Sequence, residues 1–311
     1  MTTISAKSIL ASRHAQSGDR IDTLLLRYPR WIHAEFMTHR VFSRNAASSR
    51  AIPVERLIQD VLDDPAVPLF WGANQKGMQA GEECNEPVRV SDKEYGLWPR
   101  GDAWLQARDN AVHMARAFAA AGYHKQIVNR LLEPFSHITV VVTGTEWSNF
   151  FALRDHSDAE PHIQMLAREM KKAMAEAWVQ TLQPGEWHLP FVRDVDLDWE
   201  TQCAPGDTFK SVCLTSIEDQ IKLSVARCAS TSYKTVDGFD MTLDRAIALH
   251  DKLVASIPMH ASPAEHVCYA DVLVKHGKQY DVEMTSWKQP HLHGNFKGFC
   301  QYRKTLTGEC Q

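Results

Sequence analysis

The feature that most constrains the fold is an apolar run that stops at a proline. Residues 21–27 read Ile-Asp-Thr-Leu-Leu-Leu-Arg, a pattern typical of a largely buried strand. Pro29 then suits the first turn of a short helix that we expect to reach about Met37. A β-branched run from Ile138 to Val142 predicts a second strand. The chain is therefore expected to combine strands with helices.

Further helices are predicted from apolar residues at helical spacing and from capping signals. Five of them cover 54–62, 102–121, 124–133, 216–229 and 241–256, and Gly122 lies just beyond the end of the second. A sixth helix is expected to begin at a Ser157-x-x-Glu160 capping box. Its apolar stripe consists of Ile163, Leu166, Met170 and Met174. We interpret that last apolar stripe as core rather than as a cofactor site. Residues 266–275 and 295–304 are predicted strands, 66–100 is expected to be irregular, and 183–214 is expected to form a long ordered loop.

The composition is that of a soluble protein with no strong charge. The 311 residues are 44% hydrophobic and 23% charged, with a net charge of −4, so neither polymeric nucleic acid nor a membrane surface is expected as a partner. No stretch approaches the roughly 18 apolar residues that span a bilayer, and the N-terminus lacks a signal-peptide core, so a cytoplasmic protein is expected. The seven cysteines contain no C-x-x-C pair, which favours reduced thiols.

The densest polar stretch is 38–50, Thr-His-Arg-Val-Phe-Ser-Arg-Asn-Ala-Ala-Ser-Ser-Arg. Arginines offer bidentate donors to phosphate, and hydroxyls with backbone N–H groups add more donors. A nucleotide anion is therefore one interpretation, and a solvated basic loop is the other. Residues 72–77 have P-loop glycine spacing but lack the following Lys and Ser/Thr. His291 and His293 lack a third ligand nearby, so we predict no metal.

The polar stretch resembles the signature of the flavin-dependent thymidylate synthases (the ThyX family). That signature is Arg-His-Arg, seven residues, Ser, and an Arg two positions later. This sequence has Thr38, His39 and Arg40, followed by Ser48 and Arg50. The preceding segment 27–37 is similar to the family's strand-to-helix lead-in.

Four other blocks resemble the same family. Residues 129–134 resemble Arg-x-x-x-Pro, and 148–154 resemble Asn-Phe-Leu-x-Leu-Arg. Residues 259–266 resemble His-x-Thr-Pro-Phe-Glu-His, and 223–230 resemble the Ala-Arg-Val-Ser helix end, both of which normally precede the signature. Here they follow it, so we predict a circularly permuted order, which surface termini permit.

The resemblance implies an α+β fold, a mixed sheet flanked by helices, built as one catalytic domain over 1–311. The segments near 65–100 and 183–214 would be insertions, and 270–311 a C-terminal extension. If the order is permuted, 260–266 should fold beside the 38–50 loop, within contact of one flavin.

The resemblance also implies an activity. Family members methylate C5 of dUMP with methylenetetrahydrofolate as carbon donor, FAD as hydride carrier and NADPH as reductant. They are homotetramers with active sites at subunit interfaces. The flavin performs the redox step, so the protein positions and polarises. We expect the same partners here.

Site residues are implied one by one. Arg154 would be catalytic, because a fixed guanidinium stabilises negative charge on the pyrimidine. The alternative interpretation is that Arg154 only forms an ion pair at the protein surface. Substrate contacts are implied for Glu35, Thr38, Ser48, Ser49, Arg50, Arg130 and Arg154, with Ser48, Arg50 and Arg130 holding the phosphate. Flavin contacts are implied for His39, Arg40, Asn45, Asn149, Ser230, His260 and Ser262.

Departures from the family pattern leave the substrate open. Thr38 replaces the first Arg of the signature, Ala46 replaces a Glu, Asp158 replaces a His, and Glu35 stands where Gln is frequent. The substrate is expected to be dUMP, with UMP or dCMP and hydroxymethylation as alternatives. A nucleotide-binding homologue without turnover is a further hypothesis.

Overall fold

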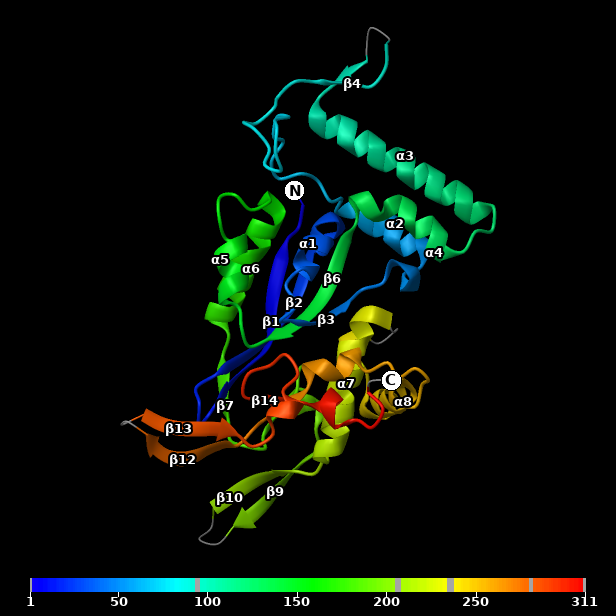
Figure 1. Ribbon diagram of the computed structural model, residues 1–311. Helices are drawn as coiled ribbons and strands as arrows, with labels where there is room; N and C mark the ends of the chain where they lie inside the picture. Colours follow the sequence, from blue (N-terminus) through cyan, green and yellow to red (C-terminus); the bar gives the residue numbers. More distant parts are fainter. Residues whose placement is uncertain (1, 93–95, 205–207, 234–237, 280–281, 310–311) are drawn as a thin grey trace.

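The computed structural model describes residues 2–92, 96–204, 208–233, 238–279 and 282–309. A five-stranded sheet lies at its centre in the order β3-β6-β2-β1-β7, with β3 at one edge (Figure 1). The strands are β1 (Ser5–His14), β2 (Arg20–Pro29), β3 (Ser43–Ala46), β6 (His137–Gly144) and β7 (Val179–Leu182). All neighbours pair antiparallel except β1 and β7, which are parallel. The predicted mixed sheet is confirmed.

Three helices cover one face of this sheet. They are α1 (His33–Met37), α5 (Ser148–Arg154) and α6 (Pro161–Glu176). Side chains alternate across a strand, so Leu24, Leu26 and Tyr28 of β2 all point to this face and are fully buried. The apolar stripe of α6 packs against them, which confirms the interpretation of that stripe as core.

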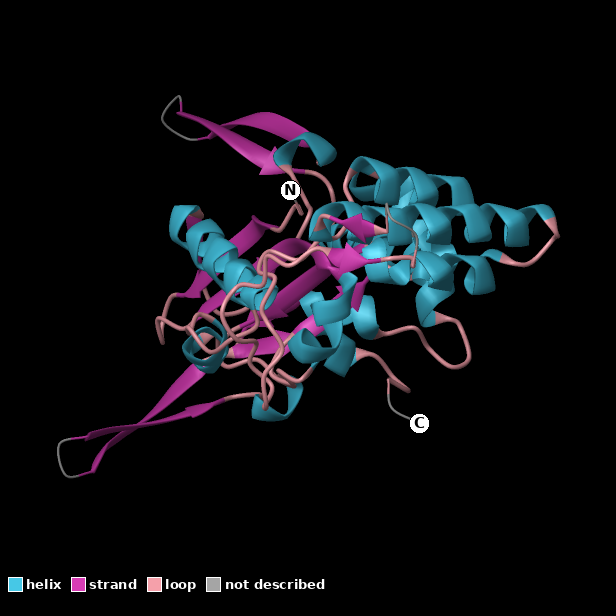
Figure 2. Ribbon diagram, turned by 90° about the horizontal axis from the view of Figure 1, so that it is seen from above, coloured by secondary structure: helices cyan, strands magenta, loops and turns pink. Residues whose placement is uncertain are grey.

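A helical group lies beyond one end of the sheet. It contains α2 (Val54–Asp63), α3 (Arg100–Ala120), α4 (Lys125–Val128) and the 3-10 helix η3 (Asn129–Phe135), which share a second hydrophobic cluster. Figure 2 shows these helices gathered on one side of the strands. Two short 3-10 helices, η1 (Arg30–Ile32) and η2 (Ser49–Ala51), lead into α1 and α2.

The C-terminal half packs against the second face of the sheet, opposite α1, α5 and α6. Its helices are α7 (Ile217–Tyr233), α8 (Leu243–Val254) and η6 (Ser262–His266), beside a small sheet in the order β14-β11-β8, formed by Phe299–Gln301, Cys268–Ala270 and Trp187–His188. Two hairpins, β9 (Trp199–Ala204) with β10 (Thr208–Cys213) and β12 (Leu273–Gln279) with β13 (Val282–Trp287), extend from this half (Figure 1). The remaining elements are β4 (Val88–Arg89), β5 (Leu97–Trp98), η4 (Asp194–Asp196), η5 (Gly238–Asp240), η7 (Pro290–Leu292) and η8 (Tyr302–Thr305).

Several local predictions were wrong in detail. Glu160, not Ser157, is the N-cap of α6, because Pro161 takes the first helical position and the Glu160 carboxylate accepts from the next two backbone N–H groups. Residues 183–214 contain β8 and the β9–β10 hairpin rather than only a loop. The predicted strand 295–304 is a strand only at Phe299–Gln301, since Gly298 has φ +79 and η8 follows.

A buried polar chain ties the C-terminal half to the other face of the sheet. The Ser12 hydroxyl lies 2.7 Å from His188 Nδ1, and His188 Nε2 lies 2.9 Å from the Thr23 hydroxyl. Thr23 bonds Thr143 at 2.7 Å, and Thr143 bonds His266 Nδ1 at 2.9 Å. All five side chains are fully buried. This series of hydrogen bonds therefore fixes η6, which ends at His266, against β6.

The edge strand β3 also contacts η6, so the segment that contains 262–266 does fold beside the 38–50 stretch. That contact was expected from a permuted order, and the permutation itself stays a prediction. Among the described residues no helix is long and apolar enough to cross a membrane. The five cysteines whose side chains are described are free, as expected.

Candidate functional site

Arg154 is the last residue of α5, and its backbone is fixed by the residue that follows. The Asp155 carboxylate bonds Arg168 at 3.0 Å and Lys171 at 2.6 Å, both on α6. These two bonds lower the pKa of Asp155, with the bond from Lys171 the larger cause. The end of α5 is thereby held to α6, and the Arg154 side chain extends the other way, toward α1.

Three predicted site residues surround the Arg154 guanidinium. Its Nε donates to His39 Nε2 at 3.0 Å, and one terminal nitrogen donates to the Glu35 carboxylate at 3.1 Å. The other terminal nitrogen lies 3.4 Å from the Thr38 hydroxyl. The Arg154 side chain is 21% exposed and that of Glu35 is 42% exposed, so the guanidinium is accessible but oriented on three sides.

His39 is neutral in this arrangement. Burial lowers its pKa, and the charges of Arg154 and Arg44 lower it further. A neutral ring accepts at Nε2, which matches the bond from Arg154. Arg44 also donates to the His39 carbonyl at 3.0 Å and the Met37 carbonyl at 3.1 Å, so it holds the turn after α1 in place.

The residues expected to hold a phosphate form a second group around η2 and η3, which pack together. The Ser49 hydroxyl donates to Glu133 at 2.8 Å, and Asn129 donates to the Ser49 carbonyl at 2.7 Å. Arg50 and Arg130 are exposed and make no hydrogen bond or ion pair with any described residue. Two cations with no partner are suited to an external anion.

No hydrogen bond or ion pair between described residues joins this second group to the Arg154 group. Ser48, half-buried at the start of η2, belongs with Arg50 and Arg130. Within one chain the candidate phosphate residues therefore have no direct bond to the candidate catalytic residue or to the three residues around it.

The residues expected to contact a flavin are distributed around β3 and its neighbours. Asn45 is buried and its amide lies 3.5 Å from the Cys228 carbonyl of α7. Ser230 is buried and bonds the Ala226 carbonyl at 3.1 Å within α7. Asn149, His260 and Ser262 are exposed, on α5, before η6 and on η6. Asn45 and Ser230 thus have structural contacts, and the three others offer polar groups at the surface.

Arg40 opens onto a cavity of about 370 Å³ between the signature stretch and the C-terminal segment. Its lining is Arg40, Phe42, Arg44, Glu265, Gly294, Asn295, Gln301, Arg303 and Lys304. Sequence reasoning missed Arg44, Arg303 and Lys304. Arg44 lay within the polar stretch and carried a signal, whereas nothing in the local pattern at 303–304 set those residues apart from a basic surface.

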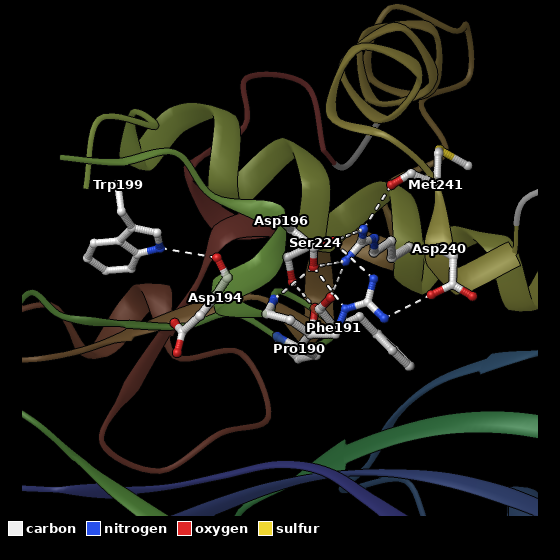
Figure 3. A network of polar contacts seen from close by, with 10 residues as sticks. Pro190, Phe191, Asp194, Asp196, Trp199, Ser224, Asp240 and Met241 are labelled. Carbon is white, nitrogen blue, oxygen red and sulfur yellow. Dashed lines mark hydrogen bonds and ion pairs between the residues drawn. The ribbon is translucent and has the colours of Figure 1, made fainter. Parts of the chain in front are cut away.

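Arg227, in the block that resembles the family's Ala-Arg-Val-Ser, has a structural role, because it bonds Asp196, Phe191 and Met241, which Figure 3 labels. Its guanidinium bonds both Asp196 oxygens, at 2.5 and 2.8 Å, and the carbonyls of Phe191 and Met241. Burial acts to raise the pKa of Asp196, but the bonds from Arg227 and Arg193 outweigh it and hold that pKa well below its usual range. This network pins η4 onto α7.

The two histidines considered as metal ligands do not meet. His291 is exposed, whereas His293 is buried and lies 2.9 Å from the Asp271 carboxylate. Asp271, His293 and Cys300 have potential ligand atoms within 4.8 Å of one another. However, Asp271 already accepts from two backbone N–H groups, and burial raises the pKa of Cys300 to about 11. Hydrogen bonds thus account for the Asp271–His293 pair, and a protonated thiol is a poor ligand.

Comparison with known proteins places the chain in a family. No curated protein sequence matches it. Two solved structures of the UMP/dUMP methylase PolB from Streptomyces cacaoi are similar in part. The complex with 5-Br dUMP is 16% identical, with a TM-score of 0.39 over 57% of this chain and 91% of that chain. The complex with 5-Br UMP is 15% identical, with a TM-score of 0.38 over 57% and 90%.

The decisive match is to a sequence family. Its model, Thy1, described as thymidylate synthase complementing protein, matches residues 20–178. This range is just over half of the chain and contains Arg154 with the three residues around it. The chain therefore belongs to the thymidylate synthase complementing protein family, the flavin-dependent thymidylate synthases that its motifs resemble.

Proposed function

We propose that this protein methylates C5 of a pyrimidine nucleotide, dUMP in the first place. The observation that carries the proposal is the convergence of Glu35, Thr38 and His39 on Arg154, within the segment that matches the family. Methylenetetrahydrofolate would donate the carbon and NADPH would reduce the flavin, as in the family.

Arg154 would act on the base. A guanidinium directed at the pyrimidine ring lowers the free energy of negative charge that develops there during attack at C5. His39 contributes as a neutral acceptor that fixes Nε of Arg154, and Glu35 fixes a terminal nitrogen. Thr38, at 3.4 Å, is the longest of the three contacts, and its hydroxyl donates to the Glu35 carbonyl at 2.7 Å, so what it can offer a substrate atom is an acceptor lone pair.

The donor set fits a flavin. FAD would supply the hydride when bound, and the protein must recognise a large ligand with a diphosphate and an isoalloxazine ring. Arg40 makes no hydrogen bond or ion pair with any described residue, and Ser262 and Asn149 expose a hydroxyl and an amide. These residues, with His39 and His260, are the ones that would hold it, while Asn45 and Ser230 would support the surrounding backbone.

The phosphate would be held by Ser48, Arg50 and Arg130 from another copy of the chain. These residues make no bond with the Arg154 group of their own chain, which supports a shared site in a homotetramer. In the same way, the contact between η6 and β3 supports a permuted single catalytic domain over 1–311.

One observation favours a second candidate function. The carboxylate of Glu35 lies 3.1 Å from the Arg154 guanidinium and reduces the positive charge that a substrate anion would meet. A homologue that binds a nucleotide without converting it is consistent with that pair. It also leaves dCMP open, because a carboxylate accepts from an exocyclic amine.

The test is incubation of the purified protein with FAD, NADPH and methylenetetrahydrofolate against dUMP, UMP and dCMP separately. Mass spectrometry of the nucleotide should show the gain of one methyl group with dUMP. The matched pair of variants is Arg154→Ala, which should abolish the product, and Arg89→Ala, which removes an exposed arginine of β4 that bonds no described residue and should leave the product unchanged.

The outcomes separate the two functions. Nucleotide-dependent thermal stabilisation without any product from the three nucleotides would favour the binding protein. A protein that binds neither flavin nor nucleotide would exclude both. Gain of a hydroxymethyl group would keep C5 chemistry and change only the final reduction.

A further inference from the structure

The cavity between β3 and the C-terminal segment has a strong excess of positive charge. Four cations line it, Arg40, Arg44, Arg303 and Lys304, against the single carboxylate of Glu265. Glu309 lies behind Arg303 and Lys304 and bonds both. Even with both carboxylates counted, two positive charges remain without an acidic partner.

Two of these cations have no carboxylate bond. Arg40 is exposed and makes no hydrogen bond or ion pair with any described residue. Arg44 donates only to backbone carbonyls, and although burial lowers its pKa, a guanidinium stays charged in a protein. A concave site that holds more cations than carboxylates indicates an anionic ligand.

The wall opposite Arg40 and Arg44 is firmly held. Gln301 donates to Asn295 at 2.6 Å and to the Ser43 hydroxyl of β3 at 3.2 Å. Asn295 in turn donates to the Val41 carbonyl at 2.9 Å. The C-terminal segment is therefore bonded to the signature stretch at two points, Val41 and Ser43, and the cations it carries are preorganised.

We propose that Arg303 and Lys304, with Arg40 and Arg44, bind the diphosphate of a dinucleotide ligand. A diphosphate matches this site because it carries at least two negative charges and several acceptor oxygens, and arginine binds such oxygens in pairs. The volume of about 370 Å³ leaves room for an attached sugar. The C-terminal segment thus completes a site that the signature stretch begins. Naming a dinucleotide rests on the proposed flavin use.

Glu265 has a distinct place in this site. It bonds Arg303, and its charge also faces Arg44. A carboxylate next to a bound diphosphate is repulsive, so Glu265 lowers the affinity while it orients Arg303. Replacement by Gln keeps an acceptor for Arg303 and removes the negative charge.

The test measures binding by calorimetry of two probes, FAD and inorganic pyrophosphate, to the full-length chain at low ionic strength. Lys304→Ala and Arg40→Gln should each weaken the binding of both probes by about tenfold, the value of one lost charge-assisted bond. Glu265→Gln should tighten it. Lys76→Ala, an exposed lysine that bonds no described residue, is the matched control and should change neither probe.

The outcomes distinguish this inference from the proposed function. FAD binding that no cavity variant alters would overturn the diphosphate site and leave flavin use standing. Pyrophosphate binding that the variants weaken, without FAD binding, would keep an anion site and refute flavin use. If the Glu265→Gln variant binds the probes more weakly than the original protein, Glu265 stabilises the fold, and its proposed role in the site is overturned.

Discussion

Acidification should destabilise this protein through the buried histidines that connect the sheet to η6. His188 and His266 are fully buried, and burial lowers the pKa of each to about 3, with the charge of His266 as a smaller cause for His188. In the unfolded chain both titrate near pH 6.5. Between the folded and the unfolded pKa values, each histidine is protonated in the unfolded state and neutral in the folded state. The free energy of unfolding therefore decreases as the pH falls.

The magnitude follows from linkage. At about pH 5.5 an unfolded histidine is about 90% protonated, and a folded one with a pKa near 3 is not, which costs about 1.4 kcal/mol of unfolding free energy per histidine. The two together give about 3 kcal/mol relative to about pH 7.5. The result changes little if the folded pKa lies anywhere well below 5.5, because the unfolded state then determines the difference.

The assay is urea unfolding followed by tryptophan fluorescence at several pH values and one protein concentration. His188→Gln and His266→Gln should each reduce the pH dependence of the unfolding free energy by about 1.4 kcal/mol, whatever they cost at neutral pH. His113→Gln, on the exposed side of α3, is the control and should not change it. Variants that keep the pH dependence of the original protein would refute the reasoning, because removal of a titrating histidine must remove the contribution of that histidine to the pH dependence.

Three predictions test the candidate active site. Arg154→Lys should lower kcat by about 10²–10³-fold, because an ammonium cannot reproduce the fixed fork of donors, and product formation at saturating substrate measures it. Glu35→Gln should change kcat/KM less than about tenfold, since a partly exposed ion pair contributes about 1 kcal/mol at most, and a larger loss would place Glu35 on the substrate. Arg154→Ala and Arg130→Ala chains should each be inactive alone. When the two are mixed and reassembled, activity should return, because one chain supplies Arg154 and the other supplies Arg130. Continued inactivity would contradict a shared site.

Local patterns predicted the strands that carry their own signal and missed those that depend on partners. β2 and β6 were found because runs of Leu and Val favour buried strands. β1 is a mixed polar sequence that pairs with β2 from Ser5 to Arg13 and with β7 from Ala11 onward. Its strand is a consequence of these neighbours, and a short window of sequence does not contain them.

The same distinction applies to the site. Family motifs indicated Glu35, Thr38 and Arg154, and the structure brings these three together. The contributions of Arg303 and Lys304 depend on the C-terminal chain returning to β3, a contact between residues far apart in sequence. The family pattern offered no counterpart for that segment, so only the fold reveals the charge that it adds.

The proposed shared site requires a surface at which a second copy of the chain can dock. Near the exposed Arg130, four large apolar side chains are exposed on α3, α4 and the segments that adjoin them: Met114 at 46%, Tyr123 at 53%, Ile127 at 47% and Leu131 at 36%. These elements pack against one another, and exposed apolar side chains that gather into a patch are typical of a surface that a partner covers.

If a second copy covers this region, assembly and activity should fail together. Ile127→Glu places a charge on the exposed side of α4 and should leave the fold intact, because the side chain is not part of the core. Light scattering should then show a smaller assembly, and the nucleotide assay should show lost product with unchanged thermal unfolding of the chain. A variant that remains assembled and active would mean that α4 faces solvent, and Arg130 would then have to serve the Arg154 of its own chain.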